Sequence, residues 1–369
     1  MPQALTVKKI DGKPGQVYYP LQLNQVSKPK PGPKELLVRL HAAALNHRDF
    51  FIRQHLYPGI SFESPLLADG LGTVVEAGSE VSSPKSLVGK RVILTPSRGW
   101  RDSPDGPENP LEFSVIGGSV LYPAGTAQDY VVVEADEVEL AAPHLSVYEG
   151  AALPLVGLTA WRALVTKGLN NNIANAAGRN ILVTGIGGGV ALSALQFAVA
   201  MGCNVYVTSS DASKLEKAKQ LGAKGGISYK ESGWEKKLGA LLPSSRPYLD
   251  AVIDGAGGDI VLKTVKLLRP GGVISSYGMT ISPKMDWLMQ AVMKNIDLKG
   301  STMGSRAEFR DMVEFVRKFK IHPVVSRVVK GLDNIDAIDD LFEDMRNGRQ
   351  FGKLVIDISS PEGEAGAKL

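Results

Sequence analysis

Apolar and polar positions alternate in two different ways along the 369-residue chain. Residues 1–150 contain short runs typical of strands, such as ELLVRLHAAA and AQDYVVVEADEVEL, separated by turns rich in proline and glycine. A polar insertion at 97–113 has too few apolar residues for a helix or a strand, so we expect a loop there.

From about residue 150, apolar runs of strand length alternate with amphipathic segments of helix length. The predicted strands are 181–184, 205–208, 249–254, 272–277 and 297–300. The predicted helices are 190–201, 214–221, 232–242, 260–268, 287–294 and 306–318. This alternation predicts an α/β fold with a parallel sheet covered by helices on both faces. Because the chain ends with another strand, GKLVIDIS, we expect a doubly wound domain inserted into a smaller β domain.

The composition is that of a globular protein, with 44% hydrophobic and 22% charged residues. The chain has no run of 18 apolar residues and no apolar signal segment at its start, so we expect a soluble, intracellular protein without a membrane partner. The single cysteine, Cys203, excludes an intramolecular disulfide framework and a cysteine-rich zinc site. Since the net charge is only +4 and the lysines are scattered among acids, we expect no nucleic-acid partner.

Residues 181–196, ILVTGIGGGVALSALQ, run from a predicted strand through a glycine-rich loop into a predicted helix. No frame gives G-x-G-x-x-G; the best window is 186–191, in which Ile186 replaces the first glycine and Ala191 the third. Helix N–H groups bind phosphate, and glycine lets a pyrophosphate approach the backbone. The loop therefore predicts a dinucleotide site at Gly185, Gly187, Gly188, Gly189 and Val190, although such a loop can also merely connect a strand to a helix.

The next predicted strand indicates which dinucleotide is bound. Sites for NAD carry an acid near its end that binds the ribose hydroxyl. Here Ser209 and Ser210 take that place and Lys214 follows, a set that favours the 2′-phosphate of NADPH. A shift of one residue would bring Asp211 to the same position and favour NAD, and Lys214 alone would pass for a solvated helix residue.

Ten segments together resemble the medium-chain dehydrogenase/reductase superfamily, in its zinc-independent, quinone-oxidoreductase-like branch, including fungal alcohol dehydrogenase-like and enoyl reductase-like members. The segments are ALNHRDFFIRQ, PLLADGLGTVVEAGSEV, VGKRV, GTAQDYVVV, AALPLVGLTAW, VTGIGGGVALSALQ, AKQLGAKGGISY, DGAGG, LRPGGVISSYG and GKLV. The resemblance implies a GroES-like β-barrel catalytic domain at 1–155 and 322–369, and a Rossmann cofactor domain at 156–321. It also implies a homodimer.

The positions that match the zinc ligands of the related alcohol dehydrogenases carry Asn46, Ala68 and approximately Leu155, with Asp69 as the neighbouring carboxylate. We therefore expect no metal. Without a Lewis acid, reduction of a double bond conjugated to a carbonyl is easier than reduction of an isolated carbonyl, because the enolate oxygen needs only hydrogen-bond donors. The resemblance thus implies NADPH-dependent reduction of an enone, enoyl compound or quinone.

The candidate catalytic residues are Asn46, Asp49 and Tyr57, with Arg53 as a further candidate donor. Phe51 takes the place of another tyrosine of the relatives. Asn46 and Asp49 also have the N-x-x-D spacing of a helix cap, so either residue can be explained by the cap alone. Arg53 can be a solvated helix residue and Tyr57 a surface tyrosine, in which case solvent supplies the proton.

The resemblance implies further cofactor contacts at Thr159, Tyr229, Gly255, Tyr277, Gly278, Met279, Met303, Gly352 and Lys353. Two other functions stay open: a metal-free aldehyde or ketone reductase, and a low-turnover NADPH-binding sensor. The chain ends in Ala367-Lys368-Leu369, which resembles a peroxisomal address. We therefore expect a cytoplasmic or peroxisomal protein, with the peroxisomal import receptor as a partner in the second case.

Overall fold

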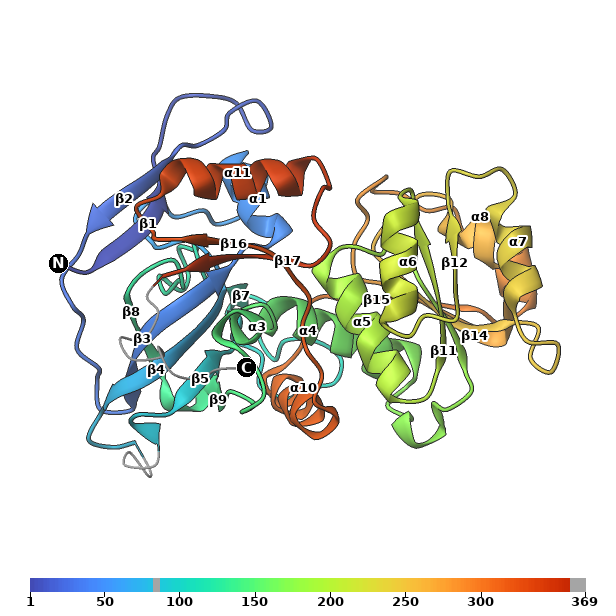
Figure 1. Ribbon diagram of the computed structural model, residues 1–369, viewed down its shortest axis with the longest axis horizontal. Helices are drawn as coiled ribbons and strands as arrows, with labels where there is room; N and C mark the ends of the chain where they lie inside the picture. Colours follow the sequence, from blue (N-terminus) through green and yellow to red (C-terminus); the bar gives the residue numbers. More distant parts are fainter. Residues whose placement is uncertain (82–86, 359–369) are drawn as a thin grey trace. The chain divides into compact units, whose positions relative to one another are not determined.

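The computed structural model describes residues 1–81 and 87–358, and it divides into two compact units (Figure 1). Among the described residues, unit 1 contains 1–81, 87–155 and 305–358, and unit 2 contains 156–304. Helix α4 (Pro154–Trp161) crosses from the first unit into the second. Within the described ranges, no helix is both long enough and apolar enough to cross a membrane.

Unit 1 is built on a seven-stranded sheet in the order β16-β17-β3-β4-β5-β9, with β8 also paired to β3. Its strands are β3 (Glu35–Ala44), β4 (Asp69–Ala77), β5 (Arg91–Leu94), β8 (Tyr130–Glu134), β9 (Val138–Leu140), β16 (Val325–Lys330) and β17 (Lys353–Asp357). Two small two-stranded sheets pair β1 (Gln3–Val7) with β2 (Leu21–Gln25) and β6 (Ser97–Arg98) with β7 (Ser114–Val115).

The register of this sheet determines where the polar residues at one end of β3 meet. Ala44, the last residue of β3, pairs with Asp69 of β4 on one side and with Val355 of β17 on the other. Both pairings are antiparallel, so continuing the second register by two residues brings Lys353 opposite Asn46. Three segments far apart in sequence therefore place polar side chains around the end of one strand.

The helices that the structure describes in unit 1 are α1 (His47–Arg53), α3 (Val147–Ala151), the short 3-10 helix η1 (Ala135–Glu137), α10 (Arg306–Phe319) and α11 (Ile335–Arg346). Helix α11 buries Ile338, Leu341 and Phe342 in one apolar cluster with Ile52 of α1 and Leu354 of β17. Burying these side chains stabilises the unit by about 2 kcal/mol each. The cluster fixes α1 beside the end of β17.

The second domain boundary, predicted near residue 321, lies before helix α10 in the structure. The sequence assigned this helix to the cofactor domain, but its contacts are with unit 1. The Arg306 backbone N–H donates to the carbonyl of Trp100, its guanidinium lies 2.7 Å from Glu139, and Arg317 donates to the carbonyl of Leu140. These charge-assisted bonds hold α10 in the first unit, so unit 2 ends at residue 304.

Unit 2 contains a parallel six-stranded sheet in the order β12-β11-β10-β13-β14-β15. The strands are β10 (Asn180–Val183), β11 (Asn204–Ser209), β12 (Gly225–Ser228), β13 (Leu249–Asp254), β14 (Leu268–Ser276) and β15 (Asp297–Gly300). The helices are α5 (Gly189–Ala200), α6 (Ala212–Gln220), α7 (Trp234–Leu241), α8 (Ile260–Thr264), α9 (Met289–Met293), the π-helix η2 (Arg162–Gly168) and the 3-10 helix η3 (Ile173–Asn175).

Two adjacent glycines show that helices cover both faces of this sheet. A Cβ on Gly225 would lie 3.0 Å from Leu241 of α7, whereas a Cβ on Gly226 would lie 2.9 Å from Leu215 of α6. Because neighbouring residues of a strand point to opposite faces, α6 and α7 lie on opposite faces of β12. The doubly wound parallel sheet predicted from the alternating pattern is confirmed.

The insertion at 97–113 is mostly loop, as predicted, but its ends pair as β6 and β7. The Glu108 carboxylate accepts the backbone N–H groups of Arg101, Asp102 and Ser103 at 2.9 Å each. Although burial alone would raise the pKa of Glu108, these bonds lower it to about 2. The Glu108 carboxylate thus holds residues 101–103 and 108 of the insertion together.

Candidate active site

The junction between β3 and α1 contains the candidate residues Asn46 and Asp49. Asn46 is the N-cap of α1, and the Asp49 carboxylate accepts the Asn46 backbone N–H at 2.8 Å. The predicted cap is therefore present. The side-chain amide of Asn46 bonds to residues from other strands, so the cap does not account for the whole residue.

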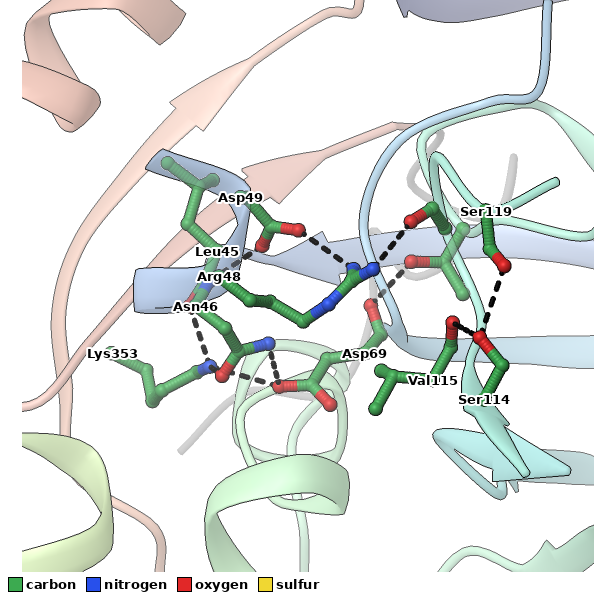
Figure 2. A network of polar contacts seen from close by, with 11 residues as sticks. Leu45, Asn46, Arg48, Asp49, Asp69, Ser114, Val115, Ser119 and Lys353 are labelled. Atoms are coloured by element: carbon green, nitrogen blue, oxygen red, sulfur yellow. Dashed lines mark hydrogen bonds and ion pairs between the residues drawn. The ribbon is translucent and has the colours of Figure 1, made fainter. Parts of the chain in front are cut away.

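Figure 2 shows the Asn46 amide between an ammonium and a carboxylate. Lys353 Nζ donates to Asn46 Oδ1 at 2.6 Å, to the Leu45 carbonyl at 2.6 Å and to Asp69 Oδ2 at 2.8 Å. Asn46 Nδ2 donates to the same Asp69 oxygen at 3.0 Å. Asn46, Asp69 and Lys353 are at most 5% exposed. We call these residues, with Arg48 and Asp49, the Asn46 network.

A second buried ion pair completes the network. The Arg48 guanidinium lies 3.1 Å from Asp49 Oδ1 and donates to the Gly117 carbonyl at 2.8 Å. Burial raises the pKa of Asp49 to about 6, while Arg48 and the Asn46 backbone N–H oppose that rise. Arg48 also lies over the ring of half-buried Tyr57, with 4.7 Å between its guanidinium carbon and the ring centre. Asn46, Asp49 and Tyr57 are thus brought to one place.

Arg53 is not the solvated helix residue that the sequence allowed, because its side chain is buried. It is 2% exposed and its guanidinium bonds Asp339 of α11 at 2.5 Å and the Tyr19 carbonyl at 2.9 Å. The rings of Tyr18 and Phe342 lie 4.1 and 4.6 Å from its guanidinium carbon. Every one of these contacts attaches α1 to its neighbours, so Arg53 has a structural role.

The glycine loop of unit 2 joins β10 to α5. Gly187 has φ of +133°, which favours glycine, and Gly188 is the N-cap of α5. A Cβ on Gly188 would meet no atom within 4 Å, so there is open space above the first helical N–H groups. Beside the loop, the Thr184 hydroxyl donates to Asp254 at 2.6 Å, and Asp254 accepts the N–H of Gly257 at 2.8 Å. The loop fits a dinucleotide pyrophosphate.

The predicted 2′-phosphate residues lie at the end of β11. The Lys214 side chain extends over the loop, because a Cβ on Gly187 would lie 3.0 Å from Lys214 Cδ and 3.3 Å from Nζ. Asp211 is engaged in capping α6, where its carboxylate accepts the Ser213 N–H at 2.8 Å. Ser209 is buried and accepts the Asp211 N–H, whereas Ser210 is exposed. The Lys214 ammonium therefore lies against the glycine loop, while the Asp211 carboxylate is used to cap α6.

Other predicted cofactor residues gather at the carboxyl ends of the parallel strands, where doubly wound sheets bind ligands. Tyr277 follows β14, and a Cβ on Gly255 would lie 2.6 Å from its hydroxyl oxygen. The same test places Met279 beside Gly257. Thr159 is 3.8 Å from the Met303 sulfur. Tyr229 follows β12 and is 43% exposed. Gly352 and Lys353 belong to unit 1, where Lys353 joins the Asn46 network.

Known proteins share both parts of this architecture. Family models for the alcohol dehydrogenase GroES-like domain and the zinc-binding dehydrogenase match residues 32–143 and 189–318. The zinc-type alcohol dehydrogenase-like protein YogA of Leptosphaeria maculans is 62% identical over 362 residues, which are 97% of this chain and all of that protein. The chain belongs to the medium-chain dehydrogenase/reductase superfamily.

Two more distant proteins resemble this dehydrogenase/reductase over nearly their whole length. A Sinorhizobium meliloti protein described as an alcohol dehydrogenase has a solved structure that superimposes with a TM-score of 0.82 at 29% identity, covering 97% of this chain and 98% of that one. The acryloyl-coenzyme A reductase of Sulfurisphaera tokodaii is 25% identical over 347 residues, which are 91% of this chain and 96% of that protein. As a member of the superfamily, this dehydrogenase/reductase is an oxidoreductase of a pyridine-nucleotide-dependent family with a GroES-like and a Rossmann-like domain.

The residues of this dehydrogenase/reductase do not fit the zinc that one of the matching models implies. The positions matched to metal ligands meet around Asp69, because Asn46 bonds it, Ala68 precedes it and the Leu155 N–H donates to it at 2.7 Å. The cation beside this carboxylate is the Lys353 ammonium. In residues 1–81 and 87–358, no group of three or more His, Cys, Asp or Glu could hold a metal.

Sequence reasoning missed Arg48 and Asp254, and it assigned Lys353 only to the cofactor. Asp254 ends β13, LDAVID, a strand that is buried throughout, and an acid in that place was a usable signal. Arg48 has no such signal, since an arginine in the first turn of a helix is usually exposed. Its burial depends on Tyr57 and on Gly117, which is 69 residues away.

Proposed function

We propose that this dehydrogenase/reductase transfers hydride from NADPH to the β-carbon of a double bond conjugated to a carbonyl, or to a quinone, without a metal ion. The bound nucleotide supplies the hydride. The observation that carries the proposal is the Asn46 network, in which the amide of Asn46, at a position matched to a metal ligand, bonds the carboxylate of Asp69 and the ammonium of Lys353. The similarity to an acryloyl-coenzyme A reductase is consistent with it.

The chemistry of the network matches the needs of this reaction. Hydride addition at the β-carbon moves negative charge onto the carbonyl oxygen, and the resulting enolate is stabilised by hydrogen-bond donors. The Asn46 amide nitrogen has two hydrogens, and one of them bonds Asp69. Its other hydrogen has no partner among residues 1–81 and 87–358, and we propose that it donates to a substrate oxygen. An amide donor is sufficient for an enolate, whereas an isolated ketone requires stronger polarisation.

Asp49 positions Asn46 in this scheme and does not supply the proton. One of its oxygens accepts the Asn46 backbone N–H and the other faces Arg48. The proton for the α-carbon comes from Tyr57, beneath the Arg48 guanidinium, or from water. Replacing Tyr57 with phenylalanine distinguishes these sources. If Tyr57 is the proton donor, the variant loses kcat and keeps its affinity for NADPH. If water is the donor, kcat is unchanged.

NADPH is the proposed cofactor because Lys214 lies against Gly187 and Ser210, the residue after β11, is exposed. An ammonium and hydroxyls bind a 2′-phosphate, which a free carboxylate would repel. The carboxylate of Asp211 is held by the N-terminus of α6. NAD is the alternative, and it predicts equal or better turnover with NADH.

A second candidate is metal-free reduction of an aldehyde or ketone, favoured by the alcohol dehydrogenase description of the Sinorhizobium meliloti protein. NADPH deuterated at its transferred hydrogen distinguishes the two reactions. Deuterium on the β-carbon of a saturated ketone supports the proposal, whereas deuterium on an alcohol carbon supports the second candidate. NADPH binding without any transfer to an enone or a para-quinone contradicts both and favours a sensor.

The partner and location also remain proposals. We propose a homodimer that forms through β15, which pairs only with β14 within the described sheet and carries Leu298 at 41% exposure. The peroxisomal address predicted at 367–369 lies outside the described residues. We propose it on its sequence alone, with the import receptor as partner and the cytoplasm as the alternative location.

A further inference from the structure

Lys353 is a buried lysine whose ammonium makes three hydrogen bonds to oxygen atoms, at 2.6, 2.6 and 2.8 Å. All three of its donors are used, so it cannot also donate to a substrate without giving up a bond. We propose that Lys353 is a positioning residue that orients the Asn46 amide for the substrate oxygen and takes the place of the cation that the matched family implies. This inference rests on the proposed function.

The two charges on either side of Asn46 determine which way its amide faces. An ammonium is donor-only, so it requires the amide oxygen, and an ionised carboxylate is acceptor-only, so it requires the amide nitrogen. Reversing the amide would put its NH2 group against Lys353 and its oxygen against Asp69. Both contacts would then be repulsive. The pair therefore selects one orientation, which leaves one N–H hydrogen for a ligand.

The orienting charges come from strands rather than from loops. Lys353 begins β17 and Asp69 begins β4, and these strands flank β3. Asp69 is further held by the Leu155 N–H at 2.7 Å, and its backbone carbonyl accepts the Thr126 hydroxyl at 2.8 Å. A site fixed by paired strands keeps its geometry during a reaction better than a site on loops. The amide is thereby pre-organised.

The same arrangement explains why a metal would not bind here. A divalent cation beside Asp69 would have to displace Lys353 or lie against its positive charge. The network is already balanced, because Lys353 faces Asp69 and Arg48 faces Asp49. An internal ammonium thus supplies the positive charge that balances Asp69, and the donor for the substrate is the amide that it orients.

The test compares Lys353→Met and Lys353→Arg with the double variant Lys353→Met/Asp69→Asn, which keeps the buried charges balanced. The control is Lys294→Met in unit 2, because the Lys294 ammonium also makes three hydrogen bonds, all of them to backbone carbonyls, but lies outside the network. We expect the single and double Met variants to lose kcat with an enone by about 100-fold, as when an oxyanion donor is lost. NADPH affinity should be unchanged in both, Lys353→Arg should recover part of kcat, and the control should match the wild type.

A second readout does not depend on turnover. In protein labelled with ¹⁵N-asparagine, the side-chain NH2 signals of Asn46 are identified by their loss in Asn46→Asp. We expect two separate, slowly exchanging proton signals in the wild type and their averaging or broadening in the folded double variant. Unchanged Asn46 signals, or full kcat in that variant, would overturn the inference. If the wild type reduces neither an enone nor a quinone, the proposed function fails, and these signals still report on the orientation.

Discussion

Asp49 gives this protein a pH dependence of stability that runs opposite to that of most acids. Its carboxyl is fully buried, and burial raises its pKa from 3.8 to about 6. Between these values the folded state keeps the proton and the unfolded state does not, so raising the pH favours unfolding. Asp49→Asn removes this titration while keeping a side-chain oxygen for the Asn46 N–H.

The magnitude follows from the two pKa values. Each pKa unit corresponds to about 1.4 kcal/mol, so the raised pKa of Asp49 contributes about 3 kcal/mol to the free energy of unfolding at pH values below both pKa values. The free energy of unfolding of the wild type, relative to Asp49→Asn, should therefore fall by about 2 kcal/mol as pH rises from 4 to 7, because part of the titration of the unfolded carboxyl lies below pH 4. The substitution also changes the uncharged contacts of this side chain, which adds an offset that is constant with pH, whereas the attraction between the Asp49 charge and Arg48 is already contained in the pKa of about 6.

Urea unfolding followed by circular dichroism, at several pH values for both proteins, measures this difference. All other titrating groups are shared, so their contributions cancel between the wild type and the variant. Glu108, whose pKa is lowered to about 2, is an example of a group that cancels. Parallel pH profiles would refute the reasoning, since they would mean that Asp49 is ionised in the folded state throughout this range. A relative gain in stability with pH would refute it as well.

Four further predictions follow from other parts of the structure. Lys214→Ala should lower kcat/KM for NADPH by about tenfold or more and leave that for NADH nearly unchanged; equal losses would argue against a 2′-phosphate site. Arg53→Met should lower the free energy of unfolding by about 2 kcal/mol in urea, because its buried guanidinium contacts are lost while Asp339 can still be solvated, with kcat unaffected. A fluorescent protein carrying the last twelve residues, ending in 367–369, should enter peroxisomes, and diffuse fluorescence would exclude the address. Light scattering should give the mass of a dimer, and Leu298→Lys should give the mass of a monomer; a wild-type monomer would contradict the proposed β15 contact.

The fold was predictable to the extent that local patterns determine it. Buried strands such as β13 and amphipathic helices such as α10 have periods that can be read directly from the sequence. Strand β12 was missed because its residues, GGIS, are neither apolar nor β-branched enough to indicate a strand; its two glycines are explained by helices packed on both faces. The boundary after α10 was wrong because Arg306 is held by residues more than 150 positions away.

The candidate site was predictable only in part. Asn46 and Asp49 follow from the motif and the cap spacing, and the glycine loop follows from its strand and helix. The roles of Arg53 and Lys353 could not be predicted, because their partners Asp339 and Asp69 lie 286 and 284 residues away in sequence. Charged residues are exposed in most proteins, so the burial of Arg53 and Lys353 depends on ion pairs with residues distant in sequence. Motifs singled out Asn46 and Asp49 as candidates, and the sheet register explains why Lys353 and Asp69 lie beside Asn46.

The most direct test of the central claim is NADPH oxidation by the wild-type protein with a small enone, before and after exhaustive treatment with a metal chelator. We predict that turnover is unchanged by the chelator and that the product is the saturated ketone. Turnover that disappears with the chelator and returns with zinc would contradict the role assigned to Lys353 and Asn46, and so would a product that is an allylic alcohol.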